Sequence, residues 1–283
     1  MRTRLAVPRV RVTRANLPIH AVLILVAVAM VAPFYWMVVT SLKLEEDIFR
    51  LPPNLVPRPA TSASYEQAFD LMPMARALYN SFKIAVLSTV GTLLTCSMAA
   101  YAFAKIRFGL KNVIFAGFLS TIMIPGQVTL IPLYILFSRI NWIDTHWPLI
   151  VPQVLLNAYG VFLLKGFMEG VPTAYVEAAK LDGASHFQIW WRIMLPLCKP
   201  ALITLGVFTF VGNWNNFLGP LIFLNSEENF TIPLIINAFR TTYYVEWGLL
   251  MAAASVAVIP VILLYLVFQR FFVEGISLAG LKG

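Results

Sequence analysis

Two groups of residues in this sequence have types and spacings that could do chemistry. The first is Asn213, Trp214, Asn215, Asn216 and Phe217, which places three amides and two aromatic rings within about 1.5 turns of one helix. Amides both donate to and accept from sugar hydroxyls, and an aromatic face can stack on a pyranose ring. The same asparagines could instead join helices across a kink. The sequence leaves both interpretations open.

The second group lies in residues 169–200, a long polar interruption of an otherwise apolar sequence. Its spaced positions are Glu177, Ala178, Ala179, Asp182, Gly183, Ile193, Leu195 and Pro196. Residues 173–181 are good helix formers, and Gly183 supplies the left-handed residue that ends such a helix. Ser185 with Gln188 is a capping-box pattern for a second helix, which Pro196 should stop. The segment predicts a short helix-turn-helix, too polar and too short to cross a membrane.

The charge of Glu177 could form an ion pair within its own helix or contact a partner chain, and the sequence indicates no catalytic role for it. Lys180 follows three residues later, so the two could form an exposed helix ion pair worth a few tenths of a kcal/mol.

No nucleophile-elbow or zinc-protease motif occurs, which disfavours an enzyme. Residues 275–280 come nearest to a phosphate-binding loop, but Leu281 stands where its lysine would be. We expect this chain to bind no cofactor, so ATP would be hydrolysed by another chain.

The elements that must position these groups are membrane helices. Hydrophobic residues make up 59% of the 283 residues and charged residues only 12%, with a mean hydropathy of +0.78. The net charge of +8 could suit nucleic acid, but the charges cluster between apolar runs rather than along one basic face, which excludes nucleic acid as a partner. Six uncharged runs are each long enough to span a bilayer: Ala21–Leu42, Ile84–Ala104, Asn112–Ser138, Thr145–Leu164, Pro200–Ser226 and Trp247–Gln269. The sequence predicts an all-α integral membrane protein with six transmembrane helices.

The distribution of Lys and Arg sets the orientation of these spans. With the N-terminus inside, the inner segments hold 14 basic residues and the outer segments 7. Both termini are therefore expected in the cytoplasm. Residues 1–16 would be a basic cytoplasmic tail, residues 17–283 one transmembrane domain, and residues 169–200 a cytoplasmic loop. The first run has 22 residues, too long for the core of a cleaved signal peptide.

The outer loops are expected to be irregular. Five prolines in residues 43–79 favour extended chain with at most a short helix near residues 65–69. The last outer loop, residues 225–246, carries Glu227, Glu228 and Glu246 against one Arg. Either loop could contact an external partner.

Two of the runs contain helix breakers. Pro125-Gly126 and Pro132 should break the third run, and residues 213–216 and 219–220 the fifth. Backbone freed at membrane depth is tolerated only where protein or a water-filled cavity receives it, so both helices should face the interior of an assembly. The candidate residues for a solute pathway are Asn213, Trp214, Asn215, Asn216 and Phe217 and, more weakly, Gln127 and Asn157.

The spacing in residues 169–200 resembles a known family. Glu-Ala-Ala, three residues, Gly, nine residues, Ile, one residue and Leu-Pro is similar to the EAA loop of permease subunits in binding-protein-dependent ABC importers. The pattern fixes seven positions over twenty residues, and none of them departs here. Residues 182–184, 213–217 with 220–221, and 275–283 resemble the carbohydrate branch, the maltose-transporter type. The resemblance covers nearly the whole chain after about residue 18 and implies the type I importer fold.

The resemblance also implies a function and a set of partners. The chain would be one permease subunit of an ATP-driven importer that moves a carbohydrate or related polyhydroxylated solute into the cytoplasm. Its loop would couple to a separate ATPase, with Glu177 meeting a basic residue there. The implied partners are a second homologous permease, two ATPase subunits that bind ATP and Mg, an extracytoplasmic solute-binding protein, the small-molecule solute and membrane lipid. The location would be a prokaryotic cell membrane.

Two alternatives remain from the residues. An importer of the same class for glycerol phosphate or polyamine is the first; a phosphate would need Arg or Lys in the pathway, and no predicted span interior has one, although the partner could supply it. The second is a channel or secondary transporter, which should carry ionisable residues at the midplane. None occurs there, and this alternative leaves the Glu177 loop unexplained.

Overall fold

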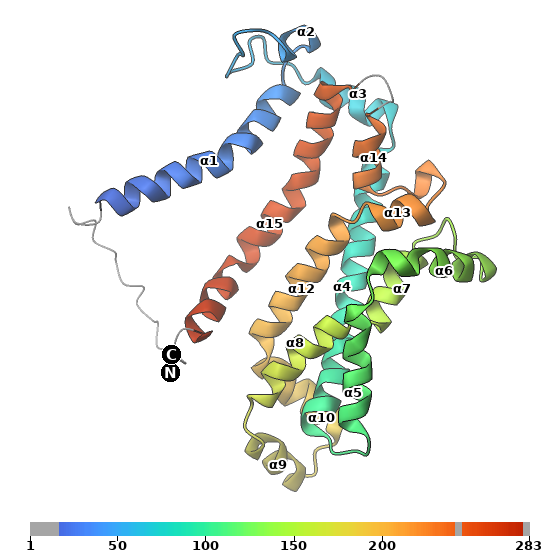
Figure 1. The fold of residues 1–283 in the computed structure, drawn as a ribbon. Coiled ribbons are helices and arrows are strands. Elements are labelled where there is room, and N and C mark those ends of the chain that lie inside the picture. Colours follow the sequence, from blue (N-terminus) through green and yellow to red (C-terminus); the bar gives the residue numbers. More distant parts are fainter. Residues whose placement is uncertain (1–16, 241–244, 280–283) are drawn as a thin grey trace.

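The computed structural model describes residues 17–240 and 245–279, so the predicted tail at residues 1–16 lies outside the described residues. Within those ranges the regular secondary structure is helical, apart from one isolated bridge between Arg240 and Val245, and loops and turns connect the helices. The helices form an elongated molecule with α2 and α3 at one end and α9 and α10 at the other (Figure 1). The predicted all-α class is confirmed.

The main helices are α1 (Leu17–Ser41), α4 (Met74–Lys105), α5 (Lys111–Ser120), α6 (Gly126–Arg139), α7 (Trp147–Leu155), α8 (Ala158–Glu169), α12 (Lys199–Trp214) and α15 (Trp247–Ala279). Shorter helices between them are α2 (Glu45–Ile48), α3 (Ala63–Leu71), η2 (Thr121–Met123), α13 (Leu218–Phe223), η4 (Glu227–Asn229) and α14 (Ile232–Ala238). Residues 169–200 contain α9 (Ala174–Leu181), α10 (His186–Ile189), the π-helix η3 (Trp190–Met194) and α11 (Leu195–Leu197).

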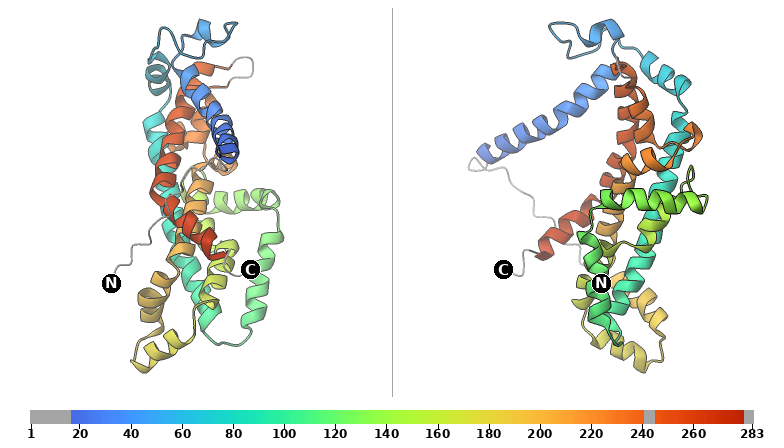
Figure 2. Two further views of the ribbon diagram at one scale, coloured as in Figure 1. Left: turned by 90° about the vertical axis from the view of Figure 1, so that its left-hand side faces the viewer. Right: turned by 45° about the vertical axis from the view of Figure 1, so that its right-hand side comes forward.

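Four of these elements are long and apolar enough to cross a membrane: α1, α4, α7 with α8, and Trp247–Gln269 of α15. Two bent pairs could add a fifth and a sixth span. One pair turns by 98° between α5–η2 and α6, and the other by 82° between residues 186–197 and α12. Figure 2 shows α6 lying across the direction of α5.

The breaks fall only partly where the sequence predicted them. The third run does break at Pro125, but α6 continues through Pro132, so the second break predicted there was wrong. The fifth run breaks at residues 215–217, as predicted from its asparagines. Residues 219–220 lie within α13, contrary to prediction, because a proline in the first turn of a helix forfeits no helical hydrogen bond.

The helix α4 begins ten residues before the predicted run, which started at Ile84. Arg76 and Lys83 lie in the first three turns of α4, where their charged side chains reach polar or aromatic neighbours. Arg76 pairs with Glu228 at 3.5 Å, and the Lys83 ammonium lies 5.7 Å from the centre of the Tyr79 ring. A charge that bounds an apolar run therefore does not bound the helix.

Small residues let α7 and α8 approach α4 closely. A Cβ added at Gly91 of α4 would lie 2.5 Å from a methyl carbon of Val154, and one added at Gly160 of α8 would lie 2.9 Å from the sulfur of Cys96. Close approach of this kind stabilises helix pairs in lipid through dispersion contacts. The helix α4 is consequently the centre of the bundle.

Side chains of α4 also satisfy the backbone where α7 ends. The Thr92 hydroxyl donates to the carbonyl of Gln153 at 3.1 Å, and the Thr95 hydroxyl donates to that of Val154 at 2.5 Å. These carbonyls sit in the last turn of α7, where helical partners run out. The backbone carbonyls next to the break between α7 and α8 are thus paired directly by side chains of α4.

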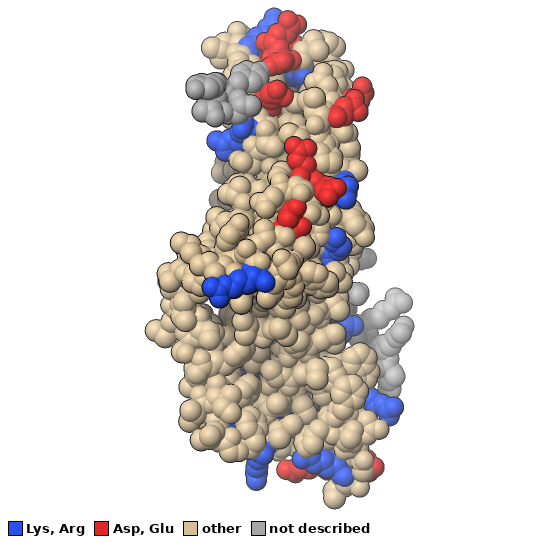
Figure 3. Space-filling model, turned by 90° about the vertical axis from the view of Figure 1, so that its right-hand side faces the viewer, with Lys and Arg blue, Asp and Glu red and all other residues tan. Residues whose placement is uncertain are grey.

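A cluster around Asp144 joins the loop before α7 to the loop after α13. Its carboxylate accepts from the backbone N–H groups of Asn225 and Ser226, each at 2.9 Å, from the Ser226 hydroxyl and from the Asn229 amide. Asn80 of α4 holds the same region by donating to the carbonyls of residues 228 and 230. In Figure 3 the acidic side chains lie in the upper part and at the bottom edge of one face, and only a few basic side chains lie in the broad zone between them.

These bonds predict an acid-sensitive contribution to stability. Burial alone raises the pKa of Asp144, but the hydrogen bonds from Ser226, Asn225 and Asn229 outweigh it and bring the pKa down from 3.8 to about 2. A lowered carboxyl pKa stabilises the fold above the unfolded value and loses that stabilisation as pH falls toward the folded one. Asp144→Asn should therefore lower Tm by a few degrees at pH 7, consistent with roughly 1–3 kcal/mol for hydrogen bonds to a charged group.

Thermal unfolding of the detergent-purified protein between pH 7 and pH 3 measures this difference, which should shrink toward the acid end. Asp70→Asn, at an exposed position on α3, is the matched control and should leave Tm unchanged. Equal Tm values for Asp144→Asn and the unmodified protein at pH 7 would contradict the structural role of the cluster.

Candidate functional site

The turn after α9 is a complete helix stop. Gly183 has a φ of +81°, the left-handed region, and its N–H donates to the carbonyl of Lys180 at 3.0 Å. The N–H of Ala184 donates to the carbonyl of Ala179 at 2.9 Å. This pair of bonds is the Schellman motif, which uses carbonyls that the helix end leaves free. The predicted left-handed stop is confirmed.

The second helix begins with the predicted capping box. The Ser185 hydroxyl accepts from the N–H of Gln188 at 3.3 Å, and the Gln188 side chain accepts from the N–H of Ser185 at 2.8 Å. The helix then widens into the π-helix η3, and α11 continues through Pro196 to Leu197. The prediction that Pro196 stops the helix was wrong by one residue, and the sharp bend follows at Cys198, where α11 ends.

The inner faces of these short helices are fixed to the bundle. Ile189, Trp190 and Met194 are buried in one apolar cluster with residues of α4, α8 and α12. Each such side chain contributes roughly 1.5–3 kcal/mol when removed from water. The Tyr101 hydroxyl and His186 Nδ1 lie 2.9 Å apart, and the Lys105 ammonium donates to the carbonyl of Val171 at 2.6 Å. The loop is thus a rigid part of the fold.

The outer faces carry charge and exposed apolar surface. Val176 and Ala179 point inward, whereas Glu177 is exposed and forms no ion pair within the described residues, including none with Lys180. Leu181 is 89% exposed and Phe187 63%. Of the other predicted positions, the exposed ones are Ala178, Asp182, Gly183 and Pro196, and the half-buried ones are Ile193 and Leu195. We call residues 174–197 with this outer face the coupling hairpin, after the loop of ABC importer permeases that its sequence resembles.

The asparagine segment has divided roles in the structure. Trp214 is buried, stacks on Phe210 with ring centres 5.9 Å apart, and donates from Nε1 to the carbonyl of Ala257 at 3.1 Å. The Asn213 amide donates to the carbonyl of Thr209 at 2.8 Å. The Asn216 side chain accepts from the N–H of Gly219 at 3.2 Å, in the first turn of α13. These contacts hold the broken helix in shape.

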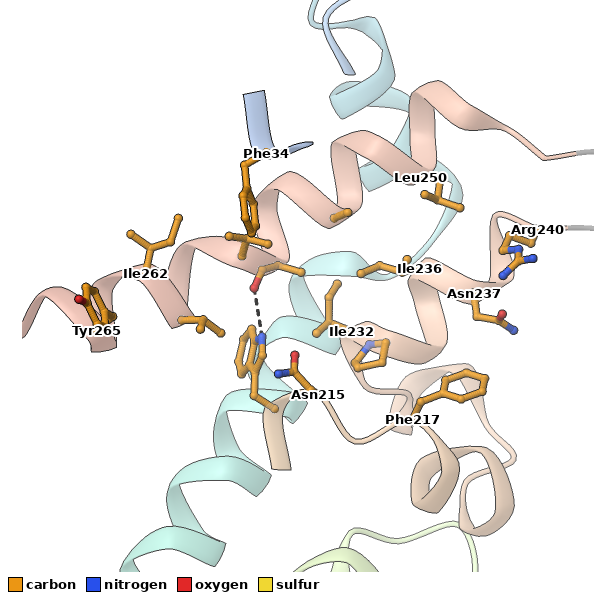
Figure 4. A pocket seen from close by; sticks show the side chains of 16 residues that line it. Phe34, Asn215, Phe217, Ile232, Ile236, Asn237, Arg240, Leu250, Ile262 and Tyr265 are labelled. Atoms are coloured by element: carbon orange, nitrogen blue, oxygen red, sulfur yellow. Dashed lines mark hydrogen bonds between the residues drawn. The ribbon is translucent and has the colours of Figure 1, made fainter. Parts of the chain in front are cut away.

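The remaining members of the segment, Asn215 and Phe217, line a cavity of about 920 Å³, which Trp214 also borders. The cavity lies between α1, α14 and α15 (Figure 4). Gln127 is exposed at the start of α6 and does not line it. Asn157 caps α8 by accepting from the N–H of Gly160 at 2.7 Å. The structure therefore brings together only part of the predicted pathway set.

Three polar lining residues were missed by the sequence reasoning: Asn237, Arg240 and Tyr265. Asn237 lies in α14 and Arg240 lies just after it. This seven-residue helix is part of the loop between α13 and α15, and it packs that loop against the bundle. Ile232 and Ile235 of α14 are buried against α4, α12 and α15. The apolar spacing of residues 232, 235 and 239 was the signal that could have revealed this helix.

No group of three His, Cys, Asp or Glu side chains that could hold a metal ion occurs in the described part of the chain. Cys96 and Cys198 are free thiols, both buried.

Comparison with known proteins identifies the class. Residues 91–278 match the family described as "Binding-protein-dependent transport system inner membrane component". The inner membrane ABC transporter permease protein YcjP of Escherichia coli strain K12 is 34% identical over 254 residues, covering 89% of this chain and 91% of YcjP. The arabinooligosaccharides transport system permease protein AraQ of Bacillus subtilis strain 168 is 32% identical over 254 residues, covering 89% and 90% of the two chains.

A solved structure shows the same fold. It is the crystal structure of a bacterial ABC transporter involved in the import of the acidic polysaccharide alginate. One chain of it aligns with a TM-score of 0.80 at 21% identity, covering 92% of this chain and 98% of that one. This chain belongs to the family of binding-protein-dependent transport system inner membrane components. It is an integral membrane permease, a transport subunit rather than an enzyme, and the resemblance of residues 169–200 to ABC importer permeases is confirmed.

The Schellman turn leads to a prediction about the coupling hairpin. A side chain at Gly183 has open space around it, so the cost of Gly183→Val is backbone strain alone, about 1–3 kcal/mol for a β-branched residue with positive φ. The strain should shift α9 relative to α10. We expect Gly183→Val to abolish solute uptake in cells while the protein still reaches the membrane.

Gly109→Val is the matched control, because Gly109 also has open space but no positive φ. Uptake and membrane abundance are measured together for both variants. Normal uptake by Gly183→Val would show that the geometry of this turn is not needed.

Proposed function

We propose that this protein is one of two permease subunits of an ATP-driven importer for a carbohydrate or related polyhydroxylated solute. A second homologous permease, two ATPase subunits that bind ATP and Mg, and an extracytoplasmic solute-binding protein complete the transporter. The bent pairs each form one span, giving six spans with both termini in the cytoplasm of a prokaryotic cell. The chain itself contacts lipid and solute, and no nucleic acid.

The observation that carries this proposal is the coupling hairpin. It is a polar, rigidly anchored element whose outer face presents the unpaired carboxylate of Glu177 beside the apolar side chains of Leu181 and Phe187. An exposed apolar patch rimmed by charge is typical of a surface that another protein covers. The ATPase is the partner that fits a transport subunit without a nucleotide site of its own.

The carbohydrate assignment rests on the relatives and the cavity. AraQ is named for arabinooligosaccharides, and the structural relative for import of a polysaccharide. Asn215 and Asn237 place two amides on the cavity wall, and Phe217 adds an aromatic ring. This combination suits hydroxyl groups and the apolar face of a sugar ring. The cavity volume of about 920 Å³ is large enough for an oligosaccharide.

Reconstitution tests the function. The complete transporter is placed in liposomes that contain ATP, and the binding protein is added to the external medium. The liposomes should take up a radiolabelled oligosaccharide only when ATP is present. Glu177→Lys should reduce uptake to less than about a tenth, since a reversed charge at a protein interface opposes docking. A Lys or Arg to Glu change on the ATPase should restore part of it. ATP-independent uptake by the unmodified transporter would contradict the proposal.

The orientation has its own test. In a variant without Cys96 and Cys198, single cysteines replace Ser62, beside α3, or Ser185, in the coupling hairpin; the two positions lie at opposite ends of the molecule (Figure 1). A membrane-impermeant thiol reagent added to intact cells should label the first and not the second, and permeabilised cells should show both labelled. Labelling of Ser185→Cys from outside would refute the cytoplasmic hairpin.

A further inference from the structure

The cavity described above has one charged residue in its lining. Of the sixteen residues that surround it, Arg240 alone carries a formal charge. The sequence places this residue in a loop, and no predicted span interior holds an Arg or Lys. The structure keeps it in that loop, but because α14 packs against α4 and α15, the guanidinium that follows α14 borders the cavity.

Arg240 is exposed, and its backbone is held in place. It forms no ion pair within the described residues, and its backbone is fixed by a bond from its N–H to the carbonyl of Asn237 at 3.0 Å and by the bridge to Val245. Glu246, the nearest acid along the chain, lines a separate polar pocket beside α2 and α3. The positive charge at the cavity edge is consequently not neutralised by that carboxylate.

The neighbours of Arg240 complete an anion-binding end. Figure 4 shows Arg240 next to Asn237 and near Phe217 at one end of the cavity, with Tyr265 at the opposite end. A guanidinium offers parallel N–H donors that match a carboxylate, and the amide of Asn237 adds another donor. Arg240 and Asn237 are both exposed, so a solute can reach them, and much of the remaining wall is aliphatic, from α14 and α15.

We propose that the solute is an anionic saccharide, and that Arg240, assisted by Asn237, binds its carboxylate or other acidic group. This inference rests on the proposed function and narrows its substrate class. The relatives do not decide the matter, since AraQ is named for arabinooligosaccharides and the structural relative for an acidic polysaccharide. For this chain, the positive charge of Arg240 is what favours an acidic saccharide over a neutral one.

Uptake by the complete reconstituted transporter tests the proposal with trisaccharides of equal length. The neutral probes are maltotriose, cellotriose and arabinotriose; the acidic probes are trigalacturonate, trimannuronate and triguluronate. The unmodified transporter should take up at least one acidic probe. Arg240→Gln should raise KM for that probe by about tenfold or more, the size of a lost hydrogen bond to a charged group. Arg240→Lys, which keeps the charge but loses the paired donors, should raise KM for that probe less than Arg240→Gln does.

Arg58→Gln is the matched control, because Arg58 is an exposed outer-loop residue away from the cavity, and it should leave uptake unchanged. Uptake of neutral probes alone would overturn the inference while leaving the proposed function standing. No uptake of any probe would overturn both. Equal KM for Arg240→Gln and the unmodified transporter would also overturn the inference. So would a loss of the second permease from purified Arg240→Gln, which would make Arg240 an interface residue.

Discussion

The structure depends on the need to pair every backbone group that lies between apolar helices, because hydrocarbon offers no partners. The helix α4 meets this need at two levels. Thr92 and Thr95 donate to carbonyls at the end of α7, and Asn80 donates to carbonyls of residues 228 and 230. An unpaired buried group costs roughly 1–3 kcal/mol. The short polar residues of α4 therefore make it possible for neighbouring segments to break and still pack against it.

What the sequence could predict was decided by local chemistry. The Schellman turn at Gly183 and the capping box of Ser185 with Gln188 involve residues at most a few positions apart, so their residue types were sufficient. The inner face of the hairpin was harder to predict, because its anchoring depends on Tyr101 and on Lys105, which lie 85 and 66 residues from their partners in the chain. The same reason hid α14: seven residues form a helix there because α4, α12 and α15 bury one side of it.

The asparagine segment shows why composition alone could not separate packing from binding. Packing and pathway were weighed as alternatives for the whole segment, whereas the structure assigns them to different residues. Asn213 and Asn216 bond to nearby backbone, and Trp214 bonds to α15. Those bonds hold the chain in the conformation that leaves Asn215 and Phe217 on the cavity wall. Because the amides of Asn213 and Asn216 bond to the backbone at the break in the helix, the side chains of Asn215 and Phe217 remain available to a solute.

The geometry of α12 explains how force on the hairpin could reach the cavity under the proposed function. The helix starts at Lys199, directly after the 82° bend, and runs unbroken to Trp214 at the cavity, a length of about 22 Å at 1.5 Å per residue. Because residues 186–197 of the hairpin lie almost perpendicular to α12, a displacement along them tilts α12 instead of compressing it. The cluster that contains Cys198, Ala201 and Leu205 keeps the two elements fixed at the bend. A tilt there moves Trp214 against α15, so the cavity must change shape or the bond from Trp214 to Ala257 must break.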